Sequence, residues 1–504
     1  QEAPTDKPFD TLATGHAAIR WMTNAQPRFG AIGPTHVDPR SGEILDANIA
    51  LESLSTRGIR AIRSQFIGMD DGAARHDHCE HSAQGSEQLG FLLDLKSVQA
   101  GLPPDSPEVQ AFVLAYLKDT TMHEVGHTLG LRHNFRASMW RTLDELNNKE
   151  LTDKFGNSAS VMDYAPINLP MPGQPGGAPF QTTLGPYDYW AIEYGYTPFS
   201  AAEEESGLRR ILSRSTDPQL AFGNDGDDMR APGKAMDPRV NVNDLSSDAI
   251  GYAEDRLKLV NTVMGKLVQK YSKPNQTFAE LRARYGALQG QRNSMIAAVS
   301  RYIGGIYIDR STPDQRSGNK PYTPVPLATQ KKAMEVLSKY VFAPNAFDAD
   351  SQVFPYLQPQ RRGFNQSNTG DDYRITSVVL NQQGAAVAHI LHPATVQRIT
   401  NSRLYGNQYS VADVMSDLVK ACFDADLKTN VNVYRQYLQT AFVKQAAIII
   451  DPKTSGYDDV ARAAALNTLK KIKTQLAGAV STNEETRAHR ANLLFLINGA
   501  LEVK

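Results

Sequence analysis

The stretch that most constrains this chain is "HEVGHTLGLRH", which runs from His123 to His133 and holds three of the chain's 11 histidines. Positions four apart lie on one face of a helix, so His123 and His127 can present their imidazoles to the same point. Gly130 permits a sharp turn out of that helix, because glycine tolerates a positive φ. The spacing therefore predicts a helix, a turn at Gly130, and a third imidazole, His133, returned to the first two.

The residues before this stretch carry a helix start signal. Ser106 is a natural N-cap, Pro107 suits the first helical position and Glu108 favours the positive helix end. Apolar residues then recur at helical spacing from Val109 to Leu117. We therefore expect one helix from about Ser106 into the histidine motif.

Three neutral imidazoles and a water make an open tetrahedral zinc site of the catalytic kind. Glu124 follows His123 directly and can reach a water on that metal. The full pattern is expected by chance on the order of 10⁻⁵ times in a chain of this length. We therefore interpret His123, His127 and His133 as zinc ligands and Glu124 as a catalytic residue.

Composition narrows the class of protein. The chain has 41% hydrophobic and 21% charged residues and a net charge of −1, so no basic surface indicates nucleic-acid binding. No apolar run approaches the roughly 18 residues that a membrane span needs. Its two cysteines, Cys79 and Cys422, are too few for a disulfide scaffold or a Cys-rich zinc site, and we expect two buried thiols.

The pattern along the 504 residues indicates more than one domain. Strands are expected at residues 17–22 and 43–51, with turn chemistry at 33–42. Residues 155–250 are rich in Gly, Pro, Asp and Asn, and amphipathic helical patterns dominate from about residue 250. We predict an α+β protein with a catalytic domain over residues 1–200, a loop-rich connection over 201–250 and a mostly helical region over 251–504.

The zinc motif resembles that of the metzincin metallopeptidases, a clan with a methionine-containing turn beneath the metal. "SVMDY", at residues 160–164, is similar to that turn, with Met162 as the matching methionine. Tyr164 matches a tyrosine that can ligate zinc in some branches. More narrowly, the chain resembles the large bacterial Met-zincin metalloproteases through segments that include "VDPRSGEILDANI", "GPYDYWAIEYGY" and "YIGGIYIDR".

This resemblance implies a metzincin-like catalytic domain, a mixed twisted sheet with the zinc-binding helix, in a secreted, periplasmic or cell-surface protein. It implies a zinc metalloendopeptidase that cleaves polypeptides through a metal-activated water, with Glu124 as general base and Tyr164 assisting the oxyanion. Met162 would pack below the ligands. The substrate strand would lie antiparallel along an edge strand within residues 43–51.

Two other functions stay open on the sequence alone. The chain would be a catalytically silent scaffold of metzincin fold whose helical region binds a partner, or a zinc hydrolase of a non-peptide amide. The retained Glu124 argues against a silent scaffold, since such a protein has no need of a base beside three ligands. Only substrate profiling distinguishes a hydrolase of non-peptide amides from a peptidase.

The sequence also contains three weaker signals of function. "NDGDD", at residues 224–228, resembles a calcium loop but lacks the full EF-hand spacing. "HDHCEH", at residues 76–81, would bind a second metal or cap the zinc with its thiol, although a local turn into the next helix is the simpler interpretation. Only 16 residues precede the first expected strand, so we expect a longer precursor whose cleaved amino-terminal portion stays bound or is replaced by later elements.

Overall fold

The fold begins with a small mixed sheet. The structure is a computed structural model that describes residues 3–4, 6, 10–24, 30–52, 80–103, 106–228, 231–315, 318, 320–358 and 373–502. The strands of this sheet are β1 (Ala17–Met22), β2 (Ala31–Ile32), β3 (Thr35–Val37) and β4 (Ile44–Glu52). β4 pairs in parallel with β1 and antiparallel with β2 and β3. The strand predicted at residues 17–22 is confirmed, while β3 lies inside the stretch that was expected to be a turn.

The prediction that a substrate strand lies along residues 43–51 is wrong, because β4 is the central strand of this sheet. β1 occupies one side of it, and β2 and β3 occupy the other. An added peptide strand needs unpaired backbone groups, and the backbone groups of β4 already pair with these neighbours. Among the described strands of this sheet, the edge positions belong to β1 and to the pair β2 and β3.

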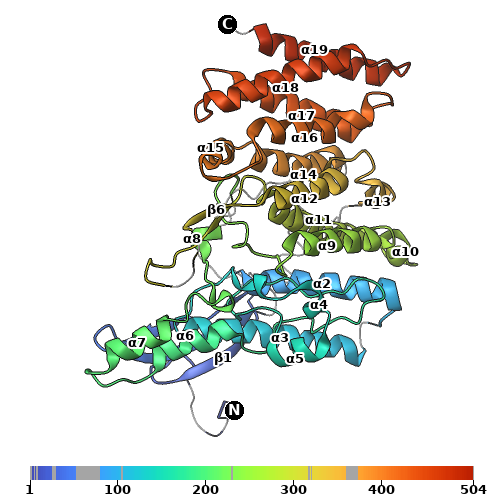
Figure 1. The fold of residues 1–504 in the computed structure, drawn as a ribbon. Helices are drawn as coiled ribbons and strands as arrows, with labels where there is room; N and C mark the ends of the chain where they lie inside the picture. Colours follow the sequence, from blue (N-terminus) through green and yellow to red (C-terminus); the bar gives the residue numbers. More distant parts are fainter. Residues whose placement is uncertain are drawn as a thin grey trace.

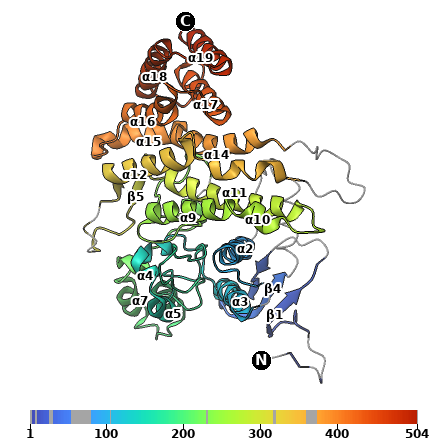
Figure 2. The ribbon, with the colours of Figure 1, turned by 90° about the vertical axis from the view of Figure 1, so that its right-hand side faces the viewer.

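Two long helices, α2 (His81–Ala100) and α3 (Pro107–Thr128), pack against each other and against the sheet, as Figure 2 shows. The Ser106 side chain accepts a hydrogen bond from the Val109 N–H at 3.3 Å, and Pro107 occupies the first helical position. The start predicted for this helix is therefore confirmed. α3 carries the first two histidines of the motif.

A loop-rich stretch follows, with only short helices. They are α4 (Leu143–Leu146), α5 (Lys149–Phe155), α6 (Pro186–Tyr196), α7 (Glu204–Leu212), α8 (Asp225–Asp228) and the 3-10 turns η1 (Ala137–Trp140) and η2 (Pro218–Leu220). Its backbone reaches the motif segment, since the Asn241 N–H donates to the Phe135 carbonyl and the Asn243 N–H donates to the Tyr164 carbonyl. The stretch predicted as a connection is thus built into the neighbourhood of the motif.

Helices then rise away from the sheet in successive layers, and the last of them, α19, lies at the far end of the molecule (Figure 1). The longer ones are α9 (Ala249–Met264), α11 (Ala279–Ser300), α12 (Leu327–Leu337), α14 (Ile375–Ile390), α15 (Pro393–Ser402), α16 (Val411–Phe423), α17 (Val433–Ile450), α18 (Asp459–Ala477) and α19 (Glu484–Glu502). The shorter elements are α10 (Leu267–Tyr271), α13 (Asp348–Ser351), η3 (Ser338–Phe342), η4 (Phe354–Tyr356), η5 (Arg403–Tyr405), η6 (Asp424–Asp426) and the hairpin β5 (Ile306–Ile308) and β6 (Tyr322–Pro324). The predicted α+β class, with a large helical region after the sheet, describes this architecture.

Two further expectations concern single features of these helices. Cys422 on α16 is a fully buried thiol, as expected, while Cys79 lies outside the described residues. Among the described helices, none is both long and apolar enough to cross a bilayer.

The sheet-side half and the helical half share one hydrophobic core. Phe91, Leu92 and Leu95 of α2 are almost fully buried, and they belong to the same cluster as apolar residues of α9 and α11. α2 contacts both of those helices directly. The helical region therefore covers the face of α2 that the sheet leaves open.

Candidate metal centre

Helix α3 ends where the third histidine has to turn back. Gly130 adopts a φ of 85°. Its N–H donates to the His127 carbonyl at 2.9 Å, and the Leu131 N–H donates to the Gly126 carbonyl at 3.0 Å. These two bonds close the helix around a left-handed residue, a position that favours glycine. The turn predicted at Gly130 is therefore confirmed.

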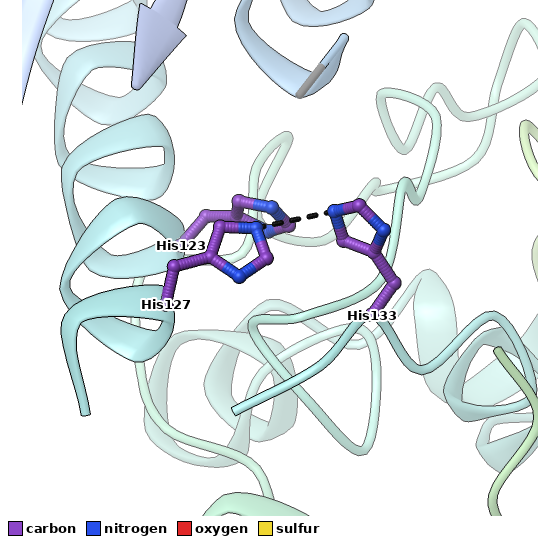
Figure 3. Close-up of side chains that lie close together, drawn as sticks. All are labelled: His123, His127 and His133. Carbon is purple, nitrogen blue, oxygen red and sulfur yellow. Dashed lines mark hydrogen bonds between the residues drawn. The ribbon is translucent and has the colours of Figure 1, made fainter. Parts of the chain in front are cut away.

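The three histidines converge on one point, His123 and His127 from α3 and His133 from the segment that faces it (Figure 3). Each histidine offers one ring nitrogen, and these three nitrogens lie within 4.8 Å of one another. The Nε2 atoms of His127 and His133 are 3.1 Å apart. Two nitrogens bound to one tetrahedral zinc at ~2.05 Å lie ~3.3 Å from each other. Within the described residues, this is the one group of three His, Cys, Asp or Glu side chains arranged to hold a metal.

Backbone carbonyls orient the two helical rings. His123 Nδ1 lies 2.7 Å from the Val161 carbonyl, and His127 Nδ1 lies 3.1 Å from the Leu131 carbonyl. A carbonyl only accepts, so each Nδ1 carries the proton and each Nε2 keeps a lone pair for a metal. Burial is the main cause that lowers the pKa of His123 well below its usual value and that of His127 to about 4. Both rings are therefore neutral, as metal ligands must be.

A carboxylate orients the third ring. His133 Nδ1 lies 2.8 Å from the carboxylate of Asp225, the first residue of α8. Such a pair holds the imidazole in the tautomer that presents Nε2. All three rings thus have one nitrogen bound to the protein and the other turned to the shared point, so the donor set fits zinc.

The calcium expectation for residues 224–228 is not supported. Asp225 contacts His133, Asp227 forms an ion pair with Arg310, and Asp228 forms one with Arg301 at 2.6 Å. A calcium loop needs such oxygens turned inward on one cation. Here they orient side chains of the protein instead.

Glu124 is fully buried on α3, directly after His123. Gly33, between β2 and β3, packs on it so closely that a Cβ there would be 2.6 Å from the Glu124 carbonyl oxygen and 3.3 Å from its Oε2. The edge formed by β2 and β3 therefore runs past this carboxylate.

Met162 lies fully buried beneath α3. A Cβ at Gly126, inside the histidine motif, would be 2.2 Å from the Met162 Sδ, so the glycine makes room for the sulfur. The Met162 carbonyl accepts a hydrogen bond from the Asn134 N–H at 2.9 Å, one residue beyond His133. The turn at residues 160–164 thus contacts both the helix with the first two histidines and the segment with the third.

Tyr164 faces the same cluster. Its hydroxyl lies 3.1 Å from the Nε2 of His133 and accepts a hydrogen bond from the Glu80 N–H at 3.0 Å. The ring itself is buried, with 3% of its surface exposed. The first turn of α2 and the turn at residues 160–164 therefore meet at this hydroxyl.

Asp188 on α6 also supports the metal centre, although it was not predicted from the sequence. Its carboxylate accepts hydrogen bonds from the Ser160 hydroxyl at 2.6 Å, the Val161 N–H at 3.0 Å and the Gly185 N–H at 2.8 Å. Asp188 therefore fixes the backbone whose Val161 carbonyl orients His123. No local pattern marks it, since it stands in "GPYDYW" among residues noted only for their resemblance.

His81, the first residue of α2, has a role beside the cluster that its sequence did not predict. Its ring stacks on that of His123, with centres 4.2 Å apart and planes 4° from parallel. Its Nε2 lies 3.7 Å from an Asp119 carboxylate oxygen. The remaining members of "HDHCEH" that were considered for a second metal or a thiol cap, residues 76, 78 and 79, lie outside the described residues.

Comparison with known proteins places this site in a family. A family model described as Met-zincin matches residues 105–430, which is more than half of the chain. No curated protein and no solved structure matches the chain. The matched region contains the three histidines that could bind zinc, together with Met162 and Tyr164. The family match supports a metallopeptidase that depends on zinc. Because the match covers more than half of the chain, the chain belongs to the Met-zincin family.

Proposed function

We propose that this protein is a zinc endopeptidase that hydrolyses internal peptide bonds of polypeptides in a metzincin-like catalytic domain. One observation carries the proposal: three imidazoles converge on one point beside a helix that carries two of them and a buried glutamate. A zinc ion held there would polarise the scissile carbonyl and make the attacking water more acidic.

Glu124 is the general base in this proposal. It stands on the same turn of α3 as His123, and its side chain is fully buried. There it takes a proton from the attacking water and later delivers it to the leaving amine. Its burial keeps bulk water away, so the proton stays on the carboxylate between the two transfers.

Tyr164 is the second catalytic group that we propose. Its hydroxyl lies within hydrogen-bond distance of the His133 Nε2, so it already stands at the point where the rings meet. From there it donates a hydrogen bond to the oxygen that becomes negative in the tetrahedral state. Met162 takes no chemical part and supports the helix from below.

The substrate is proposed to bind along the edge formed by β2, Gly33 and β3. Among the described strands, neither β2 nor β3 pairs with any strand except β4, so no described strand occupies their outer side. An extended peptide adds to such an edge through backbone hydrogen bonds. Because Gly33 touches Glu124, a peptide on this edge would bring one of its bonds to the catalytic carboxylate.

Cleavage of a defined peptide library tests this function. We expect internal cleavage by the zinc-loaded chain, complete loss after treatment with a chelator and recovery when zinc is added back. Release of single terminal residues would contradict an endopeptidase. Cleavage that persists without metal would contradict the role of the three histidines.

A further inference from the structure

A cavity of about 480 Å³ lies beside the segment that carries His133. Arg136, which lines it, follows His133 by three positions, and Phe222, which also lines it, precedes Asp225 by three. Three residues of extended chain span at most ~11 Å. The cavity wall therefore begins close to the third histidine and to the carboxylate that orients it.

Arg136 is one of the residues that line this cavity. In the part of the chain that the structure describes, its guanidinium forms no hydrogen bond or ion pair. Burial and then the neighbouring Arg239 lower the pKa of Arg136 to about 10, and the charges of Asp237 and Asp244 offset this only in part. A partly buried cation beside a second cation is costly unless an anion joins it.

The other two arginines of the wall already have carboxylate partners. Arg239 forms two hydrogen bonds to Asp237, at 2.9 and 2.7 Å, and Arg310 forms an ion pair with Asp227. Each pair cancels its own charge. Arg136 is therefore the cation of this wall that is available to a ligand.

Two further carboxylates limit what the ligand can be. Asp309 accepts a hydrogen bond from the Ser311 N–H at 2.8 Å, and Asp217 is exposed to solvent. Both would repel the second negative charge of a phosphate. Arg136 can pair with one negative charge, and the two carboxylates disfavour any further charge, so a carboxylate fits this wall better than a phosphate.

Three aromatic residues also line this cavity. Tyr187 stacks on Phe222, with ring centres 5.8 Å apart and planes 13° from parallel, and Trp190 lies 5.8 Å from Tyr187. Phe222 remains 43% exposed, which leaves apolar surface open to a ligand. An apolar or aromatic group gains from covering such surface.

We propose that this cavity binds a carboxylate carried on an apolar or aromatic body. Arg136 pairs with the carboxylate, and the rings of Tyr187, Trp190 and Phe222 cover the body. The carboxylate has two sources: a side chain or chain end of the peptide being cleaved, which rests on the proposed peptidase function, or a separate small acid.

Calorimetric titration with 3-phenylpropionate and its neutral amide tests the shared chemistry. The zinc-loaded chain is saturated with a hydroxamate, so that the acid cannot bind the metal instead. We expect the acid to bind and the amide not to bind, with affinity for the acid reduced about 10- to 100-fold in Arg136→Gln. Arg136→Lys, which retains a charge without the planar fork, should fall between them.

Arg214→Gln is the matched control, because Arg214 pairs with Glu193 and does not line the cavity. It removes the same charge and should leave the affinity for the acid unchanged. Equal binding of acid and amide to the unaltered chain would overturn the proposal without any variant. Equal affinity in the unaltered chain and in a folded Arg136→Gln would do the same.

Peptide cleavage separates the two sources. If the substrate supplies the carboxylate, kcat/KM will favour peptides with an acidic residue or chain end at one position, and Arg136→Gln will lose that preference. A preference unaffected by Arg136→Gln, with the acid still bound through Arg136, assigns the cavity to a separate acid. The titration requires no cleavage, so failure of the peptidase function would leave its result intact.

Discussion

Each histidine of the cluster has one nitrogen bound to the protein and the other turned to the shared point. Val161, Leu131 and Asp225 supply the first set of contacts. Glu124 belongs to neither set, because it lies beside His123 on the helix. Metal binding and proton transfer are thus assigned to different side chains, and single substitutions can separate them.

Glu124→Ala should keep zinc and lose turnover. The three imidazoles stay in place, while the group that accepts the water's proton is gone, so kcat should fall about 10²- to 10⁴-fold. Elemental analysis and peptide cleavage measure the two effects. Glu108→Ala, on the exposed first turn of the same helix, is the control and should leave both unchanged. Near-native cleavage by Glu124→Ala would rule out the general-base role.

Tyr164→Phe should lower kcat by about 10- to 1000-fold, the scale of losing one oxyanion donor. The hydroxyl also receives the Glu80 N–H, so a small loss of stability is expected as well. Zinc content should be preserved, because the ring still packs in its place. An unchanged kcat in the Phe variant would show that this tyrosine only packs.

His81→Ala should weaken zinc binding by about tenfold, because the ring that holds His123 flat is lost. His81→Phe keeps a flat ring in that position and should retain most of the affinity. Competition with a chelator of known affinity gives the zinc Kd of each. If the Ala and Phe variants bind zinc equally, the stack has no part in positioning His123.

Helix α3 is the element on which the site depends, and both of its ends are set by local chemistry. Ser106 and Pro107 start it, and Gly130 ends it in a left-handed turn. Its inner face lies on Met162, where the space over Gly126 is too small for a Cβ. The helix is therefore held in its position by a contact that tolerates no added side chain.

Gly126→Ala should destabilise the protein by about 1–3 kcal/mol, although alanine is the better helix former. The new Cβ would lie 2.2 Å from the buried Met162 sulfur, so that side chain must shift. Gly384→Ala on α14 is the control, since nothing lies within 4 Å of its Cβ, and it should stabilise by up to ~1 kcal/mol. Urea unfolding measures both, and a stabilising Gly126→Ala would refute the close contact.

On the scale of the whole molecule, the catalytic and helical parts share buried surface. We propose that residues 1–200, 201–250 and 251–504 differ in function but fold together. Phe91, Leu92 and Leu95 of α2 lie in one core with α9 and α11. The connection between the parts also supplies Asp225 to the metal centre.

A fragment of residues 1–250 should therefore fail to fold cooperatively. Removing α9 and α11 would expose the apolar face of α2, and exposed surface of that kind favours aggregation. Thermal melting and zinc content of the fragment, compared with the full chain, measure this. A soluble fragment that binds one zinc and melts as sharply as the full chain would show that the parts fold separately.

The sequence by itself determined those features that depend on interactions between residues close together in the chain. The start of α3 at Ser106, its end at Gly130 and the strand β1 follow from residue type and spacing within a few positions. The meeting of His123, His127 and His133 belongs to the same class, because one helix and one turn bring them together. Hydrogen bonds of caps and helical periodicity act over one or two turns, so such features can be read from the chain.

Contacts between distant segments were decided only by the tertiary structure. Asp225 lies 92 positions from the His133 that it orients, and Asp188 holds the turn at Met162 from another helix. The central place of β4, which excluded it as a substrate edge, depends on strands that pair on both of its sides. An aspartate or a strand reads the same in sequence whatever it later contacts, because the partner is chosen by how the whole chain packs.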